Sequence, residues 1–286
     1  MADLPTGTVT FLFTDIEGST TLAQQFPAEL PALLARHHTI LHQTIQAHNG
    51  HVFQIIGDAF CAAFHIASDA LQAALEAQRS LQQETWSPAL VKVRMGIHTG
   101  SAVAGAIEER AGGYVGYLTL TRVQRVMSVA HGGQVLLSNP TAELVRGELP
   151  AEVTLRDLGQ HRLKGLLNPE HLWQLIAPQL PQDFPVLQSL NAIPNNLPIQ
   201  LTSFIGREKE IADVKQRLSA SRLVTLSGAG GAGKTRLSLQ VAAEVIDSFE
   251  NGIWFIDLAP LSDATIVTNT AVSTLGLRDE AGRTAR

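Results

Sequence analysis

A proline-rich stretch divides the 286-residue chain and constrains its folding more than any other feature. Residues 177–201 carry five prolines, few charges and no periodic pattern. Because proline fixes φ and removes a backbone donor, such a stretch is typical of a linker between domains. Two domains also fit the length, since a domain averages about 150 residues. We therefore expect one domain over residues 1–176 and a second over residues 202–286.

Composition excludes several classes of protein. The formal charge is −5, from 21 Lys and Arg against 26 Asp and Glu, so we expect no direct binding of nucleic acid. Hydrophobic residues make up 45% of the chain, which supplies a core and excludes disorder as the main state. The single cysteine, Cys61, cannot form an internal disulfide. The N-terminus lacks the order of a signal peptide, and no apolar run reaches the roughly 20 residues of a membrane span. We expect a cytoplasmic protein without a membrane segment.

The first domain alternates strand and helix patterns. Two apolar runs flank Gly57-Asp58, which predicts a tight hairpin with Asp58 at its tip. The order β-α-α-β-β-α-β is that of the ferredoxin-like split βαβ, an α/β (α+β) fold. The predicted elements are strands at 8–13, 52–56, 59–64, 91–99 and 134–138, helices at 31–48, 68–81 and 117–130, and short strands up to Ile176.

The second domain begins with the pattern of a nucleoside-triphosphate fold. A helix over 207–218 and a strand over 223–226 precede a loop that fits GxxxxGK[ST], and a helix and a strand follow it. Backbone N–H groups of such a loop surround the β-phosphate, the lysine neutralises the β- and γ-phosphates, and the threonine holds Mg²⁺. We expect ATP or ADP to bind at Gly228, Gly230, Gly231, Gly233, Lys234 and Thr235.

The segment before this loop is similar to a family motif. Phe204-Ile205-Gly206-Arg207-Glu208 resembles the entry motif of the NB-ARC/STAND ATPases of bacterial regulators, in which it lies near the adenine. Asp257 resembles a Walker B carboxylate, but it follows Lys234 too closely, and the resemblance places it on the preceding strand. The sequence ends at Arg286 after part of such a domain, so we expect nucleotide binding without hydrolysis.

Two aspartates in the first domain form the second chemical feature. Asp15 ends the first strand and Asp58 lies in the neighbouring hairpin, so a split βαβ sheet brings both carboxylates to one place. Between them, residues 16–20 turn into a helix whose free N–H groups suit a triphosphate. Each aspartate alone is also explained as a helix cap or a turn residue. Their order along the chain favours a metal site.

Four motifs resemble those of the class III adenylate/guanylate cyclases over residues 4–176. They are Phe13-Thr14-Asp15-Ile16-Glu17-Gly18-Ser19-Thr20, Ile56-Gly57-Asp58-Ala59-Phe60, Arg94-Met95-Gly96-Ile97-His98-Thr99-Gly100 and His131-Gly132-Gly133-Gln134-Val135. The resemblance implies a head-to-tail homodimer with active sites at its interface. It also implies two Mg²⁺ or Mn²⁺ per site, attack of the ribose 3′-hydroxyl of ATP or GTP on the α-phosphorus, and release of pyrophosphate. The implied metal-binding residues are Asp15, Ile16 and Asp58, and the implied substrate-binding residues are Gly18, Ser19, Thr20 and Gln54.

The chain departs from the family pattern at the positions that contact the purine base of the substrate. Family members carry Lys or Glu four residues before the second metal-binding aspartate, whereas this chain has Gln54. A glutamine can hydrogen-bond a purine edge, or it can simply face outward from a strand. A second base-reading position falls near Gly113 or Tyr114.

The predicted helix over 117–130 departs as well. The resemblance implies Asn and, four residues later, Arg for the transition state, and this chain has Thr121 and Arg125. Arg125 retains the guanidinium that stabilises charge on the α-phosphate. Thr121 donates a single hydrogen bond, fewer than an amide. Arg122 is an alternative to Arg125, but it would face another side of the helix.

The histidines indicate structural roles. His98 lies on a strand that supports the sheet in the cyclase family, and His37-His38 is expected on a solvated helix face. No His/Cys spacing suggests zinc. The leading hypothesis is a nucleotide cyclase fused to a STAND-type regulatory module. The alternatives are a degenerate cyclase domain that senses nucleotide or dimerises as an input to the ATPase, and an ATPase regulator whose N-terminal domain is only structural.

Overall fold

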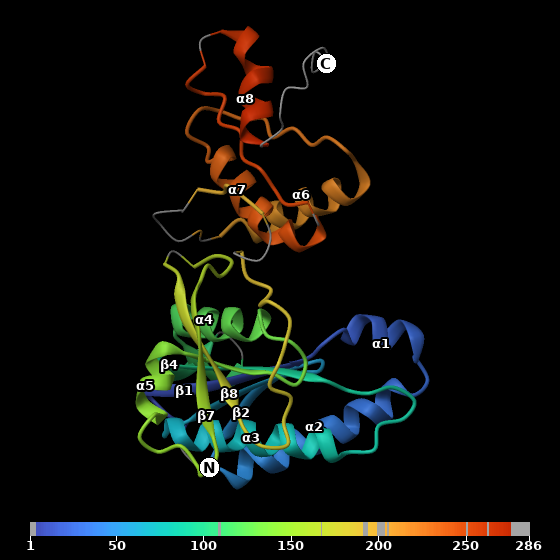
Figure 1. Ribbon diagram of the computed structural model, residues 1–286, viewed down its shortest axis with the longest axis vertical. Helices are drawn as coiled ribbons and strands as arrows, with labels where there is room; N and C mark the ends of the chain where they lie inside the picture. The colour runs from blue at the N-terminus through green and yellow to red at the C-terminus, as the bar shows by residue number, and fades with distance from the viewer. Residues whose placement is uncertain are drawn as a thin grey trace. The chain divides into compact units, whose positions relative to one another are not determined.

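The structure, a computed structural model, describes residues 4–107, 110–166, 168–190, 194–198, 204, 206–249, 251–261 and 263–275 (Figure 1). The chain divides into two compact units. The N-terminal unit comprises Met1–Leu163 and Pro169–Gln188, and the C-terminal unit comprises Lys164–Asn168 and Ser189–Arg286. Residues 177–188, within the proline-rich stretch, belong to the N-terminal unit.

One mixed sheet forms the N-terminal unit. Its strand order is β2-β3-β1-β4-β6-β8-β7, with β5 paired to β4 outside this path. The β4–β6 pair is parallel and the other pairs are antiparallel. The order β2-β3-β1-β4 is that of the predicted split βαβ. The strands are β1 (Gly7–Ile16), β2 (His51–Ile56), β3 (Ala59–Phe64), β4 (Val93–Ile107), β5 (Arg110–Val115), β6 (Val135–Ser138), β7 (Thr154–His161) and β8 (Glu170–Ile176).

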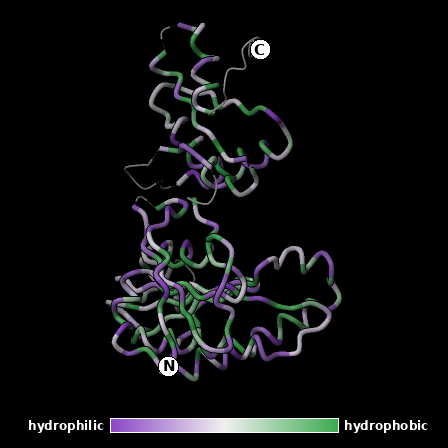
Figure 2. The backbone as a smooth tube through the Cα atoms, viewed as in Figure 1, coloured by the Kyte–Doolittle hydropathy of each residue, from purple (hydrophilic) through white to green (hydrophobic). Residues whose placement is uncertain are grey.

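Helices cover both faces of this sheet. Because successive side chains of a strand point to opposite faces, Leu12 of β1 packs with α2 and α3, while Phe11 packs beneath α4. Along the backbone, hydrophobic and hydrophilic residues alternate over short stretches (Figure 2). A Cβ at Gly96 would meet the Met127 backbone nitrogen at 2.5 Å, so this glycine lets α4 pack closely on β4. The helices are α1 (Ser19–Gln25), α2 (Leu30–Ala47), α3 (Ala67–Gln83), α4 (Tyr117–Ser128) and α5 (Asn139–Val145).

The structure corrects the prediction of a solvated His37. This residue lies four positions after Leu33 and four before Leu41, on the apolar stripe of α2, and is 0% exposed. Its ring packs edge-on against Phe60, with ring centroids 5.7 Å apart. His38 is half-buried, and its Nε2 lies 3.1 Å from the carbonyl oxygen of Gly57.

The C-terminal unit contains helices but not the two predicted strands. Residues 223–226 and 253–256 form no strand, and the one isolated bridge in the described part of this unit joins Asn195 to Ile253. A parallel strand needs neighbours to pair its backbone, and Leu223 is 82% exposed instead. No helix in the described parts of either unit is long and apolar enough to cross a membrane. The elements are α6 (Glu208–Ala220), α7 (Lys234–Val245), α8 (Val267–Thr274) and the 3₁₀ turns η1 (Ile246–Ser248) and η2 (Ala264–Ile266).

Candidate active site

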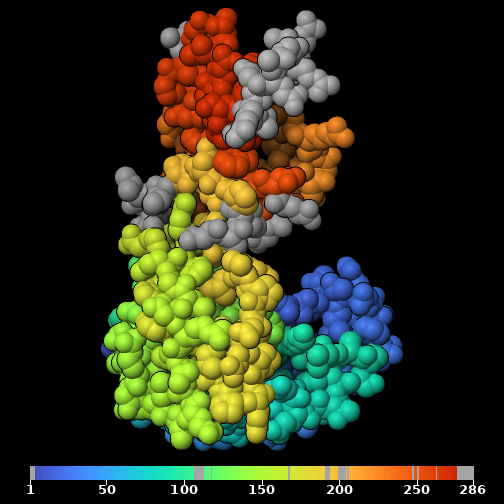
Figure 3. Space-filling view, in the orientation of Figure 1, coloured from blue at the N-terminus to red at the C-terminus, as the bar shows by residue number. Residues whose placement is uncertain are grey.

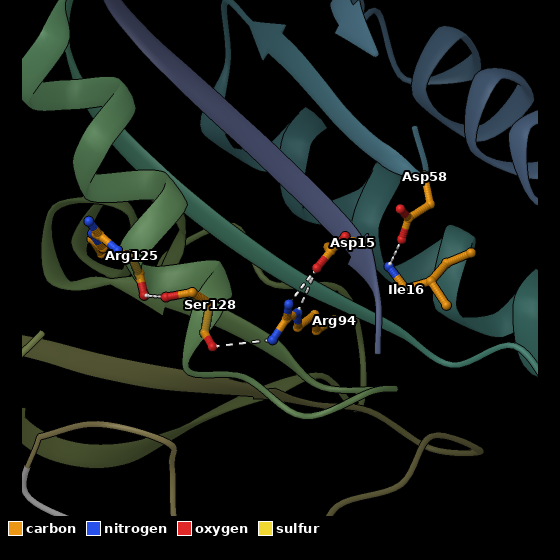
Figure 4. Close-up of polar contacts among 6 residues, drawn as sticks. All are labelled: Asp15, Ile16, Asp58, Arg94, Arg125 and Ser128. Carbon is orange, nitrogen blue, oxygen red and sulfur yellow. Dashed lines mark hydrogen bonds and ion pairs between the residues drawn. The ribbon is translucent and has the colours of Figure 1, made fainter. Parts of the chain in front are cut away.

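The two aspartates that the sequence singles out lie side by side. Asp15 is the penultimate residue of β1, and Asp58 lies in the turn between β2 and β3. The antiparallel β1–β3 pair brings this turn to the end of β1. The Ile16 N–H donates a hydrogen bond to Oδ2 of Asp58 at 2.9 Å (Figure 4). Long-range strand pairing therefore joins the two carboxylates.

Arg94 is part of this site, although the sequence interpretation gave it no role. It lies directly opposite Asp15 in the β1–β4 register, and its guanidinium forms an ion pair with the Asp15 carboxylate (Figure 4). Its Nη1 also donates to the Ser128 carbonyl at 3.4 Å. The signal was available, because opposite charges on facing residues of two neighbouring strands attract each other.

The environment of Asp15 raises the pKa of its carboxyl group above the ordinary value of 3.8. Burial is the largest cause, the hydrogen bonds and charge of Arg94 oppose it, and the neighbouring Asp58 adds to it. Two carboxylates that destabilise each other's charge are a suitable place for a divalent cation. A bound cation would compete with Arg94 for Asp15.

The donor set at this point fits a hard cation. The described residues hold no cluster of three or more His, Cys, Asp or Glu side chains that could bind a metal. Asp15 and Asp58 supply carboxylate oxygens, and Ile16 can add its main-chain oxygen. Mg²⁺ is commonly held by one or two carboxylates together with water and substrate phosphates, so two aspartates are a sufficient protein contribution.

The predicted phosphate-binding turn follows directly. Gly18 has φ of 71°, a left-handed conformation that favours glycine, and α1 begins at Ser19. Gly18 and Thr20 are exposed and Ser19 is half-buried. The Glu17 N–H donates to the Lys92 carbonyl at 2.9 Å, which ties this turn to the residue that precedes β4.

The predicted transition-state residues lie on α4. Arg125 is half-buried, and its Nε is buried without a hydrogen-bond partner in the described part of the chain. Figure 4 shows Arg125 apart from the two aspartates, so within one chain these residues do not meet. Thr121 is half-buried. Arg122 forms an ion pair at 2.8 Å with Glu170 of β8, so its guanidinium is held by a residue outside the candidate site.

The predicted base-reading residues face different surroundings. Gln54 is exposed on β2. Tyr114 is 1% exposed, and its ring packs on Phe11 and Phe53 with centroids 4.9 Å away in each case. Its hydroxyl has no partner among the described residues, and burial raises its pKa to about 12. Because Tyr114 points into the core, neighbouring Gly113 lies toward the other face of β5.

His98 belongs to a buried hydrogen-bond network. Its Nδ1 lies 2.7 Å from Ser138 Oγ, and Thr141 links Ser138 to Thr99 through contacts of 3.3 and 3.0 Å. Burial, with a smaller contribution from the charge of Arg122, lowers the pKa of His98 to about 4. These contacts tie β4 to β6 and α5.

The glycine-rich loop of the C-terminal unit contains left-handed glycines and leads into a helix. Gly231 and Gly233 have φ of 77° and 74°, and α7 begins at Lys234. Lys234 Nζ donates to the carbonyls of Gly228 and Ala229, at 2.9 Å each. The remaining predicted loop residues, Gly230 and Thr235, are exposed.

Comparisons with known proteins find relatives of the N-terminal unit among the nucleotide cyclases. The family model described as "Adenylate and Guanylate cyclase catalytic domain" matches residues 1–176. An uncharacterized protein of Mycobacterium tuberculosis is 41% identical over 211 residues, which cover 73% of this chain and 70% of the relative. A receptor-type adenylate cyclase of Trypanosoma brucei brucei is 28% identical over 211 residues, covering 60% of this chain and 17% of that protein.

Solved structures agree in fold. A structure of adenylate cyclases from Trypanosoma brucei in their monomeric state has a TM-score of 0.57 at 27% identity, covering 65% of this chain and 95% of its own. The adenylyl cyclase CyaB from P. aeruginosa has a TM-score of 0.54 at 23% identity, covering 60% and 95%, and this likeness concerns the fold alone.

Proposed function

The chain belongs to the adenylate and guanylate cyclase catalytic domain family, and from this premise we propose that residues 1–176 convert ATP or GTP into the 3′,5′-cyclic nucleotide and pyrophosphate. The observation that carries the proposal is the meeting of Asp15 and Asp58 at the end of β1, where burial and mutual repulsion raise the pKa of Asp15. A pair of carboxylates held in this way suits catalysis with a divalent cation.

Asp15, Asp58 and the main-chain oxygen of Ile16 would hold two Mg²⁺ or Mn²⁺. When bound, the cations would acidify the ribose 3′-hydroxyl and screen the charge of the triphosphate. The exposed turn at Gly18, Ser19 and Thr20 would bind phosphate oxygens through backbone N–H groups. Arg94 would leave Asp15 as the cation binds and would retain its hydrogen bond to the Ser128 carbonyl.

The remaining roles need a second copy of the chain. Arg125 lies apart from the aspartates of its own chain, and its Nε has no hydrogen-bond partner among the residues that the structure describes, which supports a role across a homodimer interface. There it would stabilise negative charge that develops on the α-phosphate. Thr121 would donate one hydrogen bond on the ribose side. Gln54, exposed on β2, would contact the purine edge, and its uncharged amide leaves ATP and GTP both as substrates.

The C-terminal unit would serve as a regulatory module. In this proposal residues 177–201 connect the cyclase domain to residues 202–286, a P-loop segment of the NB-ARC type. The support is the glycine-rich loop, whose left-handed glycines and position before α7 suit a nucleotide phosphate. Lys234 would exchange its two loop carbonyls for the β- and γ-phosphates of ATP or ADP.

The test uses the full 286-residue chain. It is incubated with Mn²⁺ and either ATP or GTP, and the products are separated by chromatography against authentic 3′,5′-cyclic nucleotides. We expect cyclic product and pyrophosphate in equal amounts, and no product when EDTA replaces Mn²⁺. Absence of cyclic product from both nucleotides, with Mn²⁺ present and the protein folded, would contradict the proposal.

The Arg94–Asp15 ion pair favours a second candidate, a nucleotide-sensing domain without turnover. An arginine that already neutralises Asp15 weakens the attraction of the site for a cation. This candidate predicts that ATP binds with Mn²⁺ but leaves unchanged. Calorimetric titration of ATP into the Lys234→Ala chain, in which the glycine-rich loop contributes little, followed by chromatography of the same sample, separates the two candidates.

A further inference from the structure

The segment that leaves the cyclase domain folds back over it. Residues 177–188, called the strap below, form neither helix nor strand and belong to the N-terminal unit. Figure 3 shows the strap in yellow on the surface of this unit. At its far end the Gln188 N–H donates to the Val129 carbonyl at 3.2 Å, just after α4, and at Ser189 the chain enters the C-terminal unit.

A small number of contacts hold the strap. Ala177, Leu180 and Leu187 are buried, whereas most residues between them are exposed. The Gln182 carbonyl accepts from Gln174 Nε2 at 2.7 Å and from Arg156 Nη1 at 3.0 Å. A segment without helix or strand whose residues are mostly exposed is typical of one that opens locally without unfolding the domain.

His131 connects the strap to the proposed metal-binding turn. Its ring stacks on Phe184, with an interplanar angle of 5° and centroids 6.3 Å apart, and its Nε2 lies 3.1 Å from the Val186 carbonyl oxygen. Its Nδ1 lies 3.8 Å from a carboxylate oxygen of Glu17, the second residue after Asp15. One side chain thus touches both the strap and the turn that carries Asp15.

The backbone next to His131 is tightly packed on the side that faces Glu17. A Cβ at Gly132 would lie 2.5 Å from Cβ of Lys92 and 2.8 Å from Oε2 of Glu17, so the backbone after His131 is pressed against both residues. On the other side, a cavity of about 470 Å³ lies under the strap, lined among others by Glu17, Leu81 and Phe184. Empty space beneath the strap removes packing contacts that would otherwise hold it down.

We propose that the strap is a latch through which the C-terminal unit controls the order of the Asp15–Glu17 turn. Docked, it holds His131 against Glu17 and so fixes the end of β1. When the chain beyond Gln188 draws the strap away, Phe184 and the Val186 carbonyl leave His131, and the turn loosens. This inference rests on the proposed function. In a cyclase, a loosened turn would hold the metal ions poorly and slow the formation of cyclic nucleotide.

The test compares hydrogen–deuterium exchange in the full chain and in Phe184→Ala. Loss of one aromatic contact should raise the opening of the strap about fivefold. We expect faster exchange in residues 177–188 and, with them, in residues 14–18 and 129–133. Val186→Ala is the matched control, because its side chain is 74% exposed and the substitution retains the carbonyl that faces His131. It should exchange like the wild type in all three segments.

Two results would overturn the latch. In the first, exchange rises in residues 177–188 alone, which would mean that the strap opens without affecting the turn. In the second, the strap stays protected in Phe184→Ala and in the double variant Arg156→Ala/Phe184→Ala, which would make it a fixed part of the domain. Exchange does not depend on turnover. Coupled exchange in a chain that forms no cyclic nucleotide would therefore contradict the proposed function and leave the latch in place.

Discussion

The two units of this chain each hold a candidate site for nucleotide phosphates, and they build it in different ways. In the N-terminal unit Asp15 lies next to the end of a strand that is paired on both sides, by β3 and by β4. In the C-terminal unit Lys234 follows a segment that forms no strand in the described structure. The first site depends on contacts between distant parts of the sequence. The second depends on the conformation of about eight neighbouring residues.

In both sites the chain itself satisfies the charged group that would meet the ligand. Arg94 pairs with Asp15, and the carbonyls of Gly228 and Ala229 accept from Lys234. The difference lies in what surrounds the charge. Burial raises the pKa of Asp15, whereas the phosphate loop is largely exposed. A ligand therefore replaces a partly desolvated ion pair in one site and solvated backbone contacts in the other, so the first site should respond more strongly to substitution.

The largest expected effect is loss of the carboxylate site. Asp58→Ala should lower the rate of cyclic nucleotide formation more than about 100-fold, because even the outer partners of metal ligands contribute about 10–100-fold. Asp15→Ala should do the same. The rates are measured with Mn²⁺, and thermal unfolding is followed in parallel to show that the fold is intact. Asp69→Ala is the matched control, since its carboxylate accepts a hydrogen bond from Asn49 at the surface, away from the site. Near wild-type turnover in either aspartate variant would remove these residues from the site.

The second effect concerns the dimer, on which the N-terminal site should depend. If Asp58 and Arg125 act from different copies, inactive Asp58→Ala mixed with inactive Arg125→Ala should regain activity. By symmetry, one site of each heterodimer carries both lesions and the other carries neither, so at most about half of the heterodimer sites recover. The recovered rate should rise with total protein concentration. Mutants that stay inactive in proven heterodimers would show that both residues act within one chain.

The third effect concerns the phosphate loop. Lys234→Ala should weaken binding of a fluorescent ADP analogue about 10–100-fold, the range for loss of a charge-assisted hydrogen bond. The measurement is made in an Asp58→Ala background, so that the N-terminal site contributes little. Lys215→Ala, which removes only the surface pair with Glu244, is the matched control. Equal affinity in all three proteins would show that the loop forms without a working pocket.

The sequence predicted local geometry better than long-range pairing. The hairpin around Asp58 and the helix after the glycine-rich loop were both predicted, because turn residues and hydrophobic periodicity act over a few positions. The split βαβ order was predicted from the order of all the elements and not from any one segment. The strand expected at residues 223–226 did not form, since a ladder needs a partner that the pattern of one segment does not reveal.

Of the candidate site, the sequence supplied the aspartates but not their surroundings. Arg94 stood in a recognised motif without a role, because only the β1–β4 register places it opposite Asp15. The contact of His131 with Glu17 and Phe184 needs the path of the strap, which no periodicity encodes. His37 was misplaced for a different reason. It is a polar residue on the apolar stripe of its helix, so its residue type and its position predict opposite exposure.

The smallest expected effect concerns how the stability of each unit depends on pH. All ten histidines lie in the N-terminal unit, and two of them, His37 and His98, are buried with the pKa lowered from 6.5 to about 4, chiefly by burial. For each, the unfolded chain takes up a proton below pH 6.5, whereas the folded chain does so only near pH 4. Their stabilisation is therefore complete above pH 6.5 and is lost as the pH falls toward 4.

His37→Leu should remove its share of this loss. Both ring nitrogens of His37 lack a hydrogen-bond partner in the described structure, so leucine leaves no new polar group unsatisfied. We expect the free energy of unfolding of the N-terminal unit to rise by about 1–2 kcal/mol at pH 5, with a smaller change at pH 7.5. Urea unfolding followed by circular dichroism at both pH values measures it. His65→Leu, at an exposed histidine, is the control and should leave the pH dependence unchanged. If the C-terminal unit, which has no histidine, lost the same stability over this pH range, buried histidines would not be the cause.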